Sequence, residues 1–323
     1  MTHKSKIIVL SSIIAALALA YISGIVFEHE RVGRRSALFT WLDARHESSI
    51  ARITIDNTVN GFESITLVQQ GGNWFVSRND KEFPARNLRV EDLIGILTRR
   101  SNFPVISTNA SSHERLGLAG NTSARITVAD GTGRSLLDLL IGQQDITGRN
   151  VFLRRLDQNE VRSGDDFFST FVTTTPVSWY NLRLFPEIET GGVNEMSVQR
   201  LTVYPPVTDE EEFQHLIFTR RGREWDFNFD LTNPDIGRVN SYIRDILNTS
   251  GNNFAEDKEP TDPDLYNSRI ALEFGDGSIR ILRFGPEENG IHFAAVTGSP
   301  FVYSVPEWSV TRLFPNISTF ERN

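Results

Sequence analysis

Two stretches of the chain have the hydrophobic spacing of an amphipathic helix. In residues 88–100 and 236–248, apolar side chains recur at positions i, i+3, i+4 and i+7, which is the spacing of one helix face. A stripe of this kind can form a partner-binding groove. Its width, however, is the width expected for core packing, so we interpret each stripe as the face of a helix that packs on its own sheet. The apolar positions are Val90, Leu93, Ile94 and Leu97 in the first stretch and Val239, Tyr242, Ile243 and Ile246 in the second.

Outside these helices, short segments alternate apolar and polar residues between turns that contain glycine. Such alternation predicts strands, and Asp-Gly pairs between two strands predict hairpin turns because both residue types tolerate positive φ. Many hairpins and one good helix in each half predict an antiparallel α+β fold rather than a parallel doubly wound sheet. Clear strands are RITI at 52–55 and RLTV at 200–203, and the predicted hairpin turns are Asp130-Gly131 and Asp276-Gly277.

The predicted elements occur twice in the same order. The two strand segments lie 148 residues apart, the two helix stripes 149 and the tryptophans after the first turn 151, and an eight-residue frame, W-x-x-x-R-L-F-P, is also repeated. We therefore predict two tandem repeats of one antiparallel-sheet domain with one main amphipathic helix each, over residues 51–190 and 197–318. The residues that mark the repeats are Trp74, Trp179, Arg183 and Phe185 in the first and Trp225, Trp308, Arg312 and Phe314 in the second.

The repeated frame is interpreted as a clamp that closes each domain. Tryptophan and arginine at i and i+4 share a helix face, so the guanidinium can lie on the indole while Leu and Phe enter the core and Pro ends the turn. A binding motif is the alternative interpretation. The clamp predicts a boundary shortly after Pro186 and a loss of about 3–5 kcal/mol when a buried Trp308 or Phe314 is truncated to alanine.

The N-terminal region contains a long uncharged segment. Residues 7–27 form a run of 21 residues without a charge, which as a helix is long enough to cross roughly 30 Å of hydrocarbon. Ala18-Leu19-Ala20 has the A-x-A form of a signal-peptide cleavage site, but the apolar run continues to Phe27, which favours an uncleaved transmembrane anchor.

The orientation of this anchor follows from the lengths on its two sides. Only residues 1–6 precede the segment, and long domains translocate largely regardless of their charge. We expect a cytoplasmic tail at 1–6, a juxtamembrane segment at 28–50 and an extracytoplasmic body, in a single-pass protein of the cytoplasmic (inner) membrane. Trp41 lies close to this membrane and is interpreted as an interfacial anchor.

Charge and composition narrow the classes of partner. The 323-residue chain has a net charge of −8, and its first 35 residues contribute +3, which leaves −11 for the rest. A net-acidic body argues against nucleic acid as a partner, because phosphate binding needs clustered Lys and Arg. The chain has no cysteine, so it has no thiolate nucleophile, disulfide or Cys-ligated zinc.

Known catalytic and ligand-binding patterns are not found in the sequence. The six histidines are dispersed without H-E-x-x-H spacing, and neither a G-x-S-x-G elbow nor a phosphate-binding P-loop occurs. Acidic runs at 209–212 and 256–264 lack the ligand spacing of a calcium loop and are interpreted as solvated loops. We therefore predict no catalytic, cofactor-binding or metal-binding residues.

Several short motifs, taken together, make the chain resemble a bacterial family of extracytoplasmic proteins, domain of unknown function 4340. They are the N-terminal apolar segment, R-I-T-I, G-x-W, the Leu116-Gly117-Leu118 turn and a hairpin that ends in Ile141-Gly142. The resemblance covers residues 50–186 and, more divergently, 197–315, where Leu265-Tyr266 replaces the Gly-Leu turn. Members of that family often occur beside components of gliding-type ABC transport systems, so the resemblance implies an envelope protein that works with a membrane export or assembly machine.

The sequence supports two hypotheses about function. The first is a non-enzymatic, membrane-anchored protein that binds a membrane partner such as a transporter permease, as an accessory subunit of an ABC-type transport or assembly system. The alternative is an extracytoplasmic carbohydrate-binding or hydrolase domain, suggested by five tryptophans and 41 acidic residues. Equivalent positions of Trp74 and Trp225 favour core packing over sugar stacking, and hence the first hypothesis.

Overall fold

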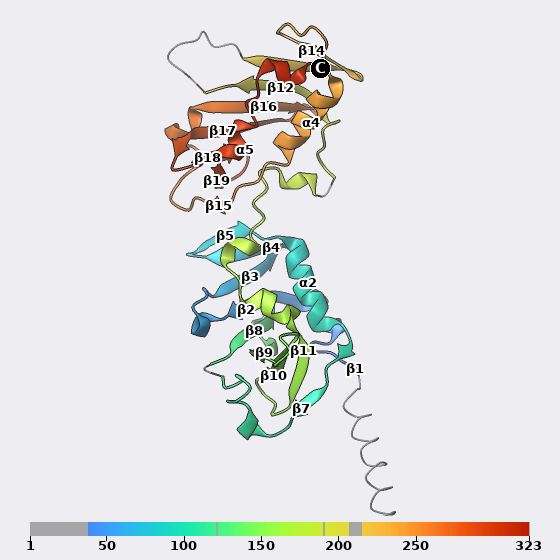
Figure 1. Cartoon of the computed structure of the whole chain (residues 1–323), viewed down its shortest axis with the longest axis vertical. Coiled ribbons are helices and arrows are strands. Elements are labelled where there is room, and N and C mark those ends of the chain that lie inside the picture. Colours follow the sequence, from blue (N-terminus) through green and yellow to red (C-terminus); the bar gives the residue numbers. More distant parts are fainter. Residues whose placement is uncertain (1–37, 121, 190, 207–214, 323) are drawn as a thin grey trace, which may run out of the picture. The chain divides into compact units, whose positions relative to one another are not determined.

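The computed structural model describes residues 38–120, 122–189, 191–206 and 215–322 (Figure 1). The chain divides into two compact units, with the division between Trp179 and Tyr180. Each unit is built on one large antiparallel sheet with few helices, so the predicted α+β class is confirmed. The predicted tail at 1–6 and anchor at 7–27 lie outside the described residues. Within the described ranges, no helix is long and apolar enough to cross a membrane.

The first unit contains a nine-stranded sheet in the order β5-β4-β3-β2-β8-β9-β10-β11-β7 and a small β1-β6 pair. Its helices are α2 (Asn87–Thr98) and α3 (Ser169–Val172), with 3-10 turns η1 (Ala44–Ser49), η2 (Thr58–Asn60), η3 (Ala110–Ser112), η4 (Asp166–Phe168) and η5 (Pro176–Trp179). Its strands are β1 (Leu38–Phe39), β2 (Ile50–Asp56), β3 (Ile65–Gln70), β4 (Asn73–Arg78), β5 (Lys81–Pro84), β6 (Ser101–Asn102), β7 (Val105–Ser107), β8 (Ala124–Asp130), β9 (Ser135–Gln144), β10 (Asn150–Arg155) and β11 (Val161–Asp165).

The second unit contains an eight-stranded sheet in the order β14-β13-β12-β16-β17-β18-β19-β15. Its helices are α4 (Ile236–Leu247) and α5 (Glu307–Thr311), with 3-10 turns η6 (Pro186–Ile188), η7 (Pro263–Tyr266) and η8 (Ile317–Phe320). Its strands are β12 (Val198–Tyr204), β13 (Leu216–Arg221), β14 (Glu224–Phe227), β15 (Asn253–Phe254), β16 (Ser268–Phe274), β17 (Ile279–Glu288), β18 (Ile291–Val296) and β19 (Val302–Pro306).

The two long helices form where the hydrophobic spacing predicts them. All four apolar positions of each stripe are buried, in α2 and in α4. The N-terminus of α4 is capped by Asp235, whose side chain accepts hydrogen bonds from the backbone N–H groups of Gly237 and Arg238. The helices therefore contribute their apolar faces to the core, which leaves their polar faces for other contacts.

Both predicted Asp-Gly hairpins are present, but one turn differs in detail. Gly277 has a positive φ of 81°, as expected for the tip between β16 and β17. Between β8 and β9 the positive φ falls on Gly133 rather than on Gly131. The Asp130 carboxylate accepts the N–H of Thr132, which holds Gly131 within the turn without a left-handed conformation.

The Leu116-Gly117-Leu118 turn packs directly on β9. A Cβ atom on Gly142 would lie 2.3 Å from the carbonyl oxygen of Leu116, so only glycine fits at this position. The close approach lets the Gln143 N–H donate to that same carbonyl at 3.1 Å. In the second unit, a Cβ atom on Gly285 would lie 2.9 Å from the carbonyl oxygen of Asp264, which belongs to η7.

Trp41 is a core residue of the first unit. Its side chain is only 2% exposed and makes edge-on ring contacts with Phe39 and Phe103 at centroid distances of 5.0 and 5.4 Å. The interpretation of Trp41 as an interfacial membrane anchor is therefore wrong. The ring is buried because β1 pairs with β6 and so brings Phe39 beside the segment that holds Phe103.

Candidate protein-binding groove

Trp74 and Trp225 are each the second residue of the second strand of a hairpin, in β4 and β14, and both are buried. The Arg220 guanidinium carbon lies 4.3 Å from the centroid of the Trp225 ring, and the indole Nε1–H donates to Asn240 Oδ1 at 3.2 Å. Trp74 donates its backbone N–H to Asn87 Oδ1 at 3.1 Å. Both tryptophans therefore fasten a hairpin to the long helix of their unit.

The first W-x-x-x-R-L-F-P frame does not form the predicted clamp. Trp179 is fully buried in the first unit, and the guanidinium over its ring belongs to Arg89, at 4.7 Å, rather than to Arg183. Arg183 lies in the second unit, where it pairs with Glu189 at 2.8 Å. The prediction is wrong because the division between the units separates the tryptophan from the arginine. Phe185 is buried in the second unit.

The second copy of the frame lies on the surface. Trp308 is 65% exposed, so the prediction that it is a buried core residue is wrong. Its ring does contact Arg312, whose guanidinium carbon lies 5.6 Å from the ring centroid, because both residues lie on the same side of α5 and its end. Phe314 is only partly buried, and its ring meets Phe284 at a centroid distance of 5.8 Å.

Arg312 also lines an open groove of about 670 Å³ in the second unit. One wall is the polar face of α4, and the other is the C-terminal segment that follows α5. The volume is in the range of ligand-binding clefts, and the lining mixes charged, hydroxyl and apolar groups. The lining residues are Asp235, Gly237, Arg238, Ser241, Tyr242, Asp245, Arg312, Pro315 and Thr319.

Hydrogen bonds join the two walls of the groove. The hydroxyl of Tyr242 donates to the carbonyl oxygen of Leu313 at 2.6 Å, and Arg238 Nη1 donates to the carbonyl oxygen of Thr319 at 3.2 Å. Burial raises the pKa of the Tyr242 phenol well above its ordinary range, so the hydroxyl stays protonated and able to donate. The groove is therefore a preformed feature of the unit.

Two charged groups in the groove are available to a ligand. Among the described residues, neither the Asp245 carboxylate nor the Arg312 guanidinium has a hydrogen-bond or ion-pair partner. Asp245 interacts electrostatically with the neighbouring Arg244, and the guanidinium of Arg312 lies over the Trp308 ring. Arg238, in contrast, has a nearby carboxylate on Asp235 at 3.7 Å. A polar segment of another protein could form ion pairs with both groups. Trp308 and Arg312 also belong to the residue types that are most enriched at protein-binding hot spots.

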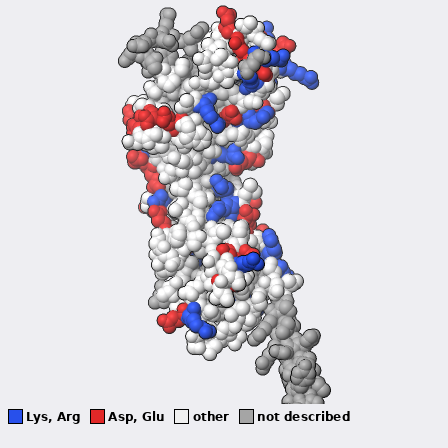
Figure 2. Space-filling model, in the orientation of Figure 1, with Lys and Arg blue, Asp and Glu red and all other residues white. Residues whose placement is uncertain are grey.

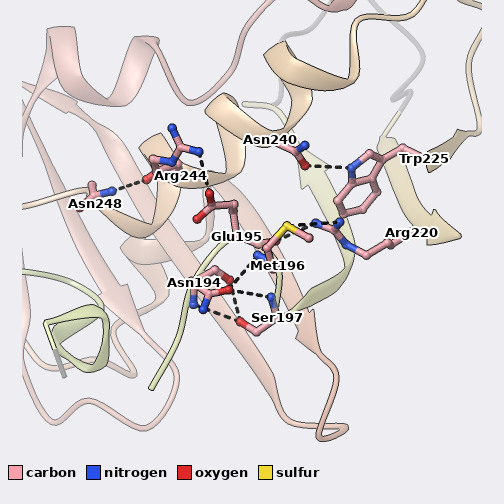
Figure 3. A network of polar contacts seen from close by, with 9 residues as sticks. All are labelled: Asn194, Glu195, Met196, Ser197, Arg220, Trp225, Asn240, Arg244 and Asn248. Carbon is pink, nitrogen blue, oxygen red and sulfur yellow. Dashed lines mark hydrogen bonds and ion pairs between the residues drawn. The ribbon is translucent and has the colours of Figure 1, made fainter. Parts of the chain in front are cut away.

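A polar network joins α4 to the turn before β12 (Figure 3). Figure 3 shows the side chains of Glu195 and Arg244 pointing toward each other, and their oxygen and nitrogen atoms are 2.6 Å apart. The hydrogen bond from Arg244 lowers the pKa of the Glu195 carboxyl. Arg220 donates to the backbone carbonyl oxygens of Glu195 and Val198 at 2.7 and 2.8 Å. These contacts fix α4 against the turn before β12 and so keep the groove wall in position.

Replacing Tyr242 with phenylalanine is expected to destabilise the second unit by about 1–2 kcal/mol, because the buried Leu313 carbonyl loses its donor while the ring packing stays. Urea unfolding of the full chain, followed by hydrogen exchange in peptides from α4, measures this change. Tyr204→Phe is the matched control, since the contacts of Tyr204 are made by its ring and the expected change is below about 0.5 kcal/mol. Equal effects of the two substitutions would contradict the proposed role of the hydroxyl.

The sequence interpretation missed the groove, although a signal for it is present. Arg238, Ser241 and Asp245 follow the spacing i, i+3, i+7, which places polar groups on one face of α4 beside the apolar stripe. Four of the five tryptophans are buried and cannot stack on a sugar. Trp308 is the one tryptophan whose ring is exposed. Within the described residues, no group of three His, Asp or Glu side chains could hold a metal ion.

Comparison with known proteins identifies the family. The model of a domain of unknown function, DUF4340, matches residues 74–268, which is more than half of the chain. The chain therefore belongs to this family, as its sequence marks indicated. No curated protein and no solved structure matches it.

Proposed function

We propose that this chain is a non-enzymatic, membrane-anchored envelope protein that binds a membrane partner, as an accessory subunit of an ABC-type transport or assembly system. The uncharged run at 7–27 supports an anchor, and the family resemblance supports a transport-associated role. The observation that carries the binding role is the groove in the second unit, with exposed Trp308 and unpaired Arg312 at its side. Tryptophan and arginine are the residue types most enriched where partners bind tightly.

We also propose that the two units are copies of one ancestral domain. Without β5, the first sheet has the order β4-β3-β2-β8-β9-β10-β11-β7, and each strand has a counterpart at the same place in the second sheet. The residue before each long helix donates its N–H to a distant carbonyl, from Arg86 to Trp179 and from Asp235 to Phe320. In this alignment the counterpart of Trp179 is Phe320 rather than Trp308, which frees Trp308 for a surface role.

Site-specific photo-cross-linking in intact membranes tests the binding role. A photoreactive amino acid at position 308 is expected to capture a membrane protein, because this position is exposed beside the groove. The control is the same amino acid at Ile146, which is fully exposed in a turn of the first unit. Capture of a transporter subunit from position 308 and not from 146 supports the proposal, whereas absence of any cross-linked protein from position 308 contradicts it.

A further inference from the structure

The second sheet has an uncovered edge at β14. In the first unit the corresponding hairpin strand, β4, is covered by β5, which pairs with it from Arg78↔Lys81 to Phe75↔Pro84. In the second unit β14 pairs with β13 on one side, and no described strand pairs with its other side. An open edge presents backbone groups that another strand can bind.

The sequence explains why this edge is covered in one unit and open in the other. In the first unit, the outward backbone groups of Trp74 are both bonded: its N–H donates to Asn87 Oδ1, and its carbonyl accepts the N–H of Ala85 at 2.9 Å. Asn87 is the first residue of α2, and Ala85 lies two residues before it. At the corresponding positions of the second unit, Pro234 lies two residues before α4 and Ile236 is its first residue. Proline has no N–H and isoleucine has no polar side chain, so neither can make the corresponding hydrogen bond to the backbone of Trp225.

The backbone groups that point outward from β14 follow from the antiparallel register. Opposed residues alternate between hydrogen-bonded and non-bonded pairs. The Asn228 N–H bonds to the Ile217 carbonyl, so Asp226 is also bonded to β13, while Trp225 and Phe227 direct their backbone groups away from it. Among the described residues these outward groups have no partner. Trp225 is buried and Phe227 is partly exposed, so an added strand would first reach the groups of Phe227.

The charge on this edge selects the partner. Glu224 and Asp226 are exposed and alternate with the inward-facing Trp225. Asp226 forms an ion pair with Arg221, but both side chains are largely exposed to solvent, and such a pair adds little stability, so a cation of a partner can replace it. The second unit carries 23 acidic and 13 basic residues from 180 to 323, a net charge of −10, and Figure 2 shows acidic side chains gathered in several groups on its visible face. Pairing of β14 with β14 of a second copy would set like charges against each other, which is unfavourable. A strand with basic residues at alternate positions is the complementary occupant.

We propose that the β14 edge binds an extended, basic segment of a partner protein by strand addition. Lysine or arginine side chains of that segment lie beside Glu224 and Asp226, and apolar side chains lie beside Trp225 and Phe227. The segment's backbone bonds to the outward groups of Trp225 and Phe227. The proposal rests on the partner-binding function and gives that partner a chemical class.

A labelled heptapeptide of alternating lysine and valine tests the proposal, with the full chain in a zwitterionic detergent at 0.15 M salt. Two further peptides carry N-methyl groups, one on every valine and one on every lysine. Methylated valines block antiparallel addition and methylated lysines block parallel addition, because only one set of N–H groups faces the edge. One of the two methylated peptides is expected to bind at least about 30-fold more weakly, and the other within about 3-fold of the parent.

Two charge-reversed variants separate this edge from general attraction to an acidic protein. Glu224→Lys with Asp226→Lys is expected to weaken binding of the parent peptide about 10-fold or more. Asp257→Lys with Glu288→Lys makes the same change in net charge at exposed positions away from β14, and the expected change is below about 3-fold. Hydrogen exchange in peptides from β13 and β14 checks that the edge variant keeps its hairpin.

Equal binding of both methylated peptides would overturn strand addition, and so would equal losses in the two charge-reversed variants. Cross-linking from position 308 tests the partner-binding function independently of these peptides. If a membrane protein is captured at 308 while the methylated peptides bind equally, the proposed function stands and the β14 edge is not its contact. If no partner is captured while one methylated peptide loses binding, the edge binds strands and the proposed function fails.

Discussion

Trp179→Ala is expected to lower the free energy of unfolding of the first unit by about 3–5 kcal/mol. The indole is fully buried, packs near Phe171 at a centroid distance of 5.9 Å and lies under the guanidinium of Arg89 at 4.7 Å. Truncation leaves a cavity and removes the ring that faces the partly buried Arg89 cation, whose pKa is lowered by desolvation. Urea unfolding of the full chain, read by hydrogen exchange in peptides from β2 and β8, measures the change.

Trp308→Ala is the matched control for this prediction. It makes the same change in the other copy of the frame, but the side chain is largely solvated and its loss is expected to alter stability by less than about 0.5 kcal/mol. Similar losses in the two variants would show that the exposed tryptophan supports the core after all. A Trp179 variant with unchanged stability would contradict the packing described for the first unit.

Gly142→Ala is expected to destabilise the first unit by at least about 2 kcal/mol. The added methyl group would lie 2.3 Å from the Leu116 carbonyl oxygen, and this contact is with backbone rather than with a flexible side chain. The turn must move away, which also breaks the hydrogen bond from the Gln143 N–H to that carbonyl. The measurement is urea unfolding with hydrogen exchange in peptides that cover β9.

Two other glycines provide a graded comparison. Gly285→Ala in the second unit should have a smaller effect, because the corresponding distance to the Asp264 carbonyl oxygen is 2.9 Å. Gly95→Ala in α2 meets no atom within 4 Å and should stabilise the helix by up to about 1 kcal/mol. An order of effects other than Gly142, Gly285, Gly95 would contradict the close packing of the turn on β9.

The helices and hairpins could be predicted from the sequence because local spacing determines them. Every apolar position of the two stripes is buried, since an amphipathic helix has one way to remove its apolar face from water. The groove could not be predicted in the same way. Its second wall, with Arg312 and Thr319, comes from a segment about 70 residues further along the chain, and only tertiary packing places it beside α4.

The repeated W-x-x-x-R-L-F-P frame does not predict burial, because its two copies lie in different environments. Trp179 lies in a 3-10 turn that packs under α2, whereas Trp308 lies on a short helix whose buried residue is Val310. The arginines differ as well, since Arg183 pairs with Glu189 and Arg312 stacks on Trp308. The residues of a short motif therefore predict burial only when the motif always has the same position relative to its sheet.

The junction at Trp179 and Tyr180 restricts how the chain can be dissected. The two residues are adjacent, and both are buried, yet they belong to different units. A fragment that ended at residue 190 would carry Leu184 and Phe185 away from the second core and expose both to solvent, which favours aggregation. Fragments intended to fold separately should therefore end at Trp179 or begin at Tyr180.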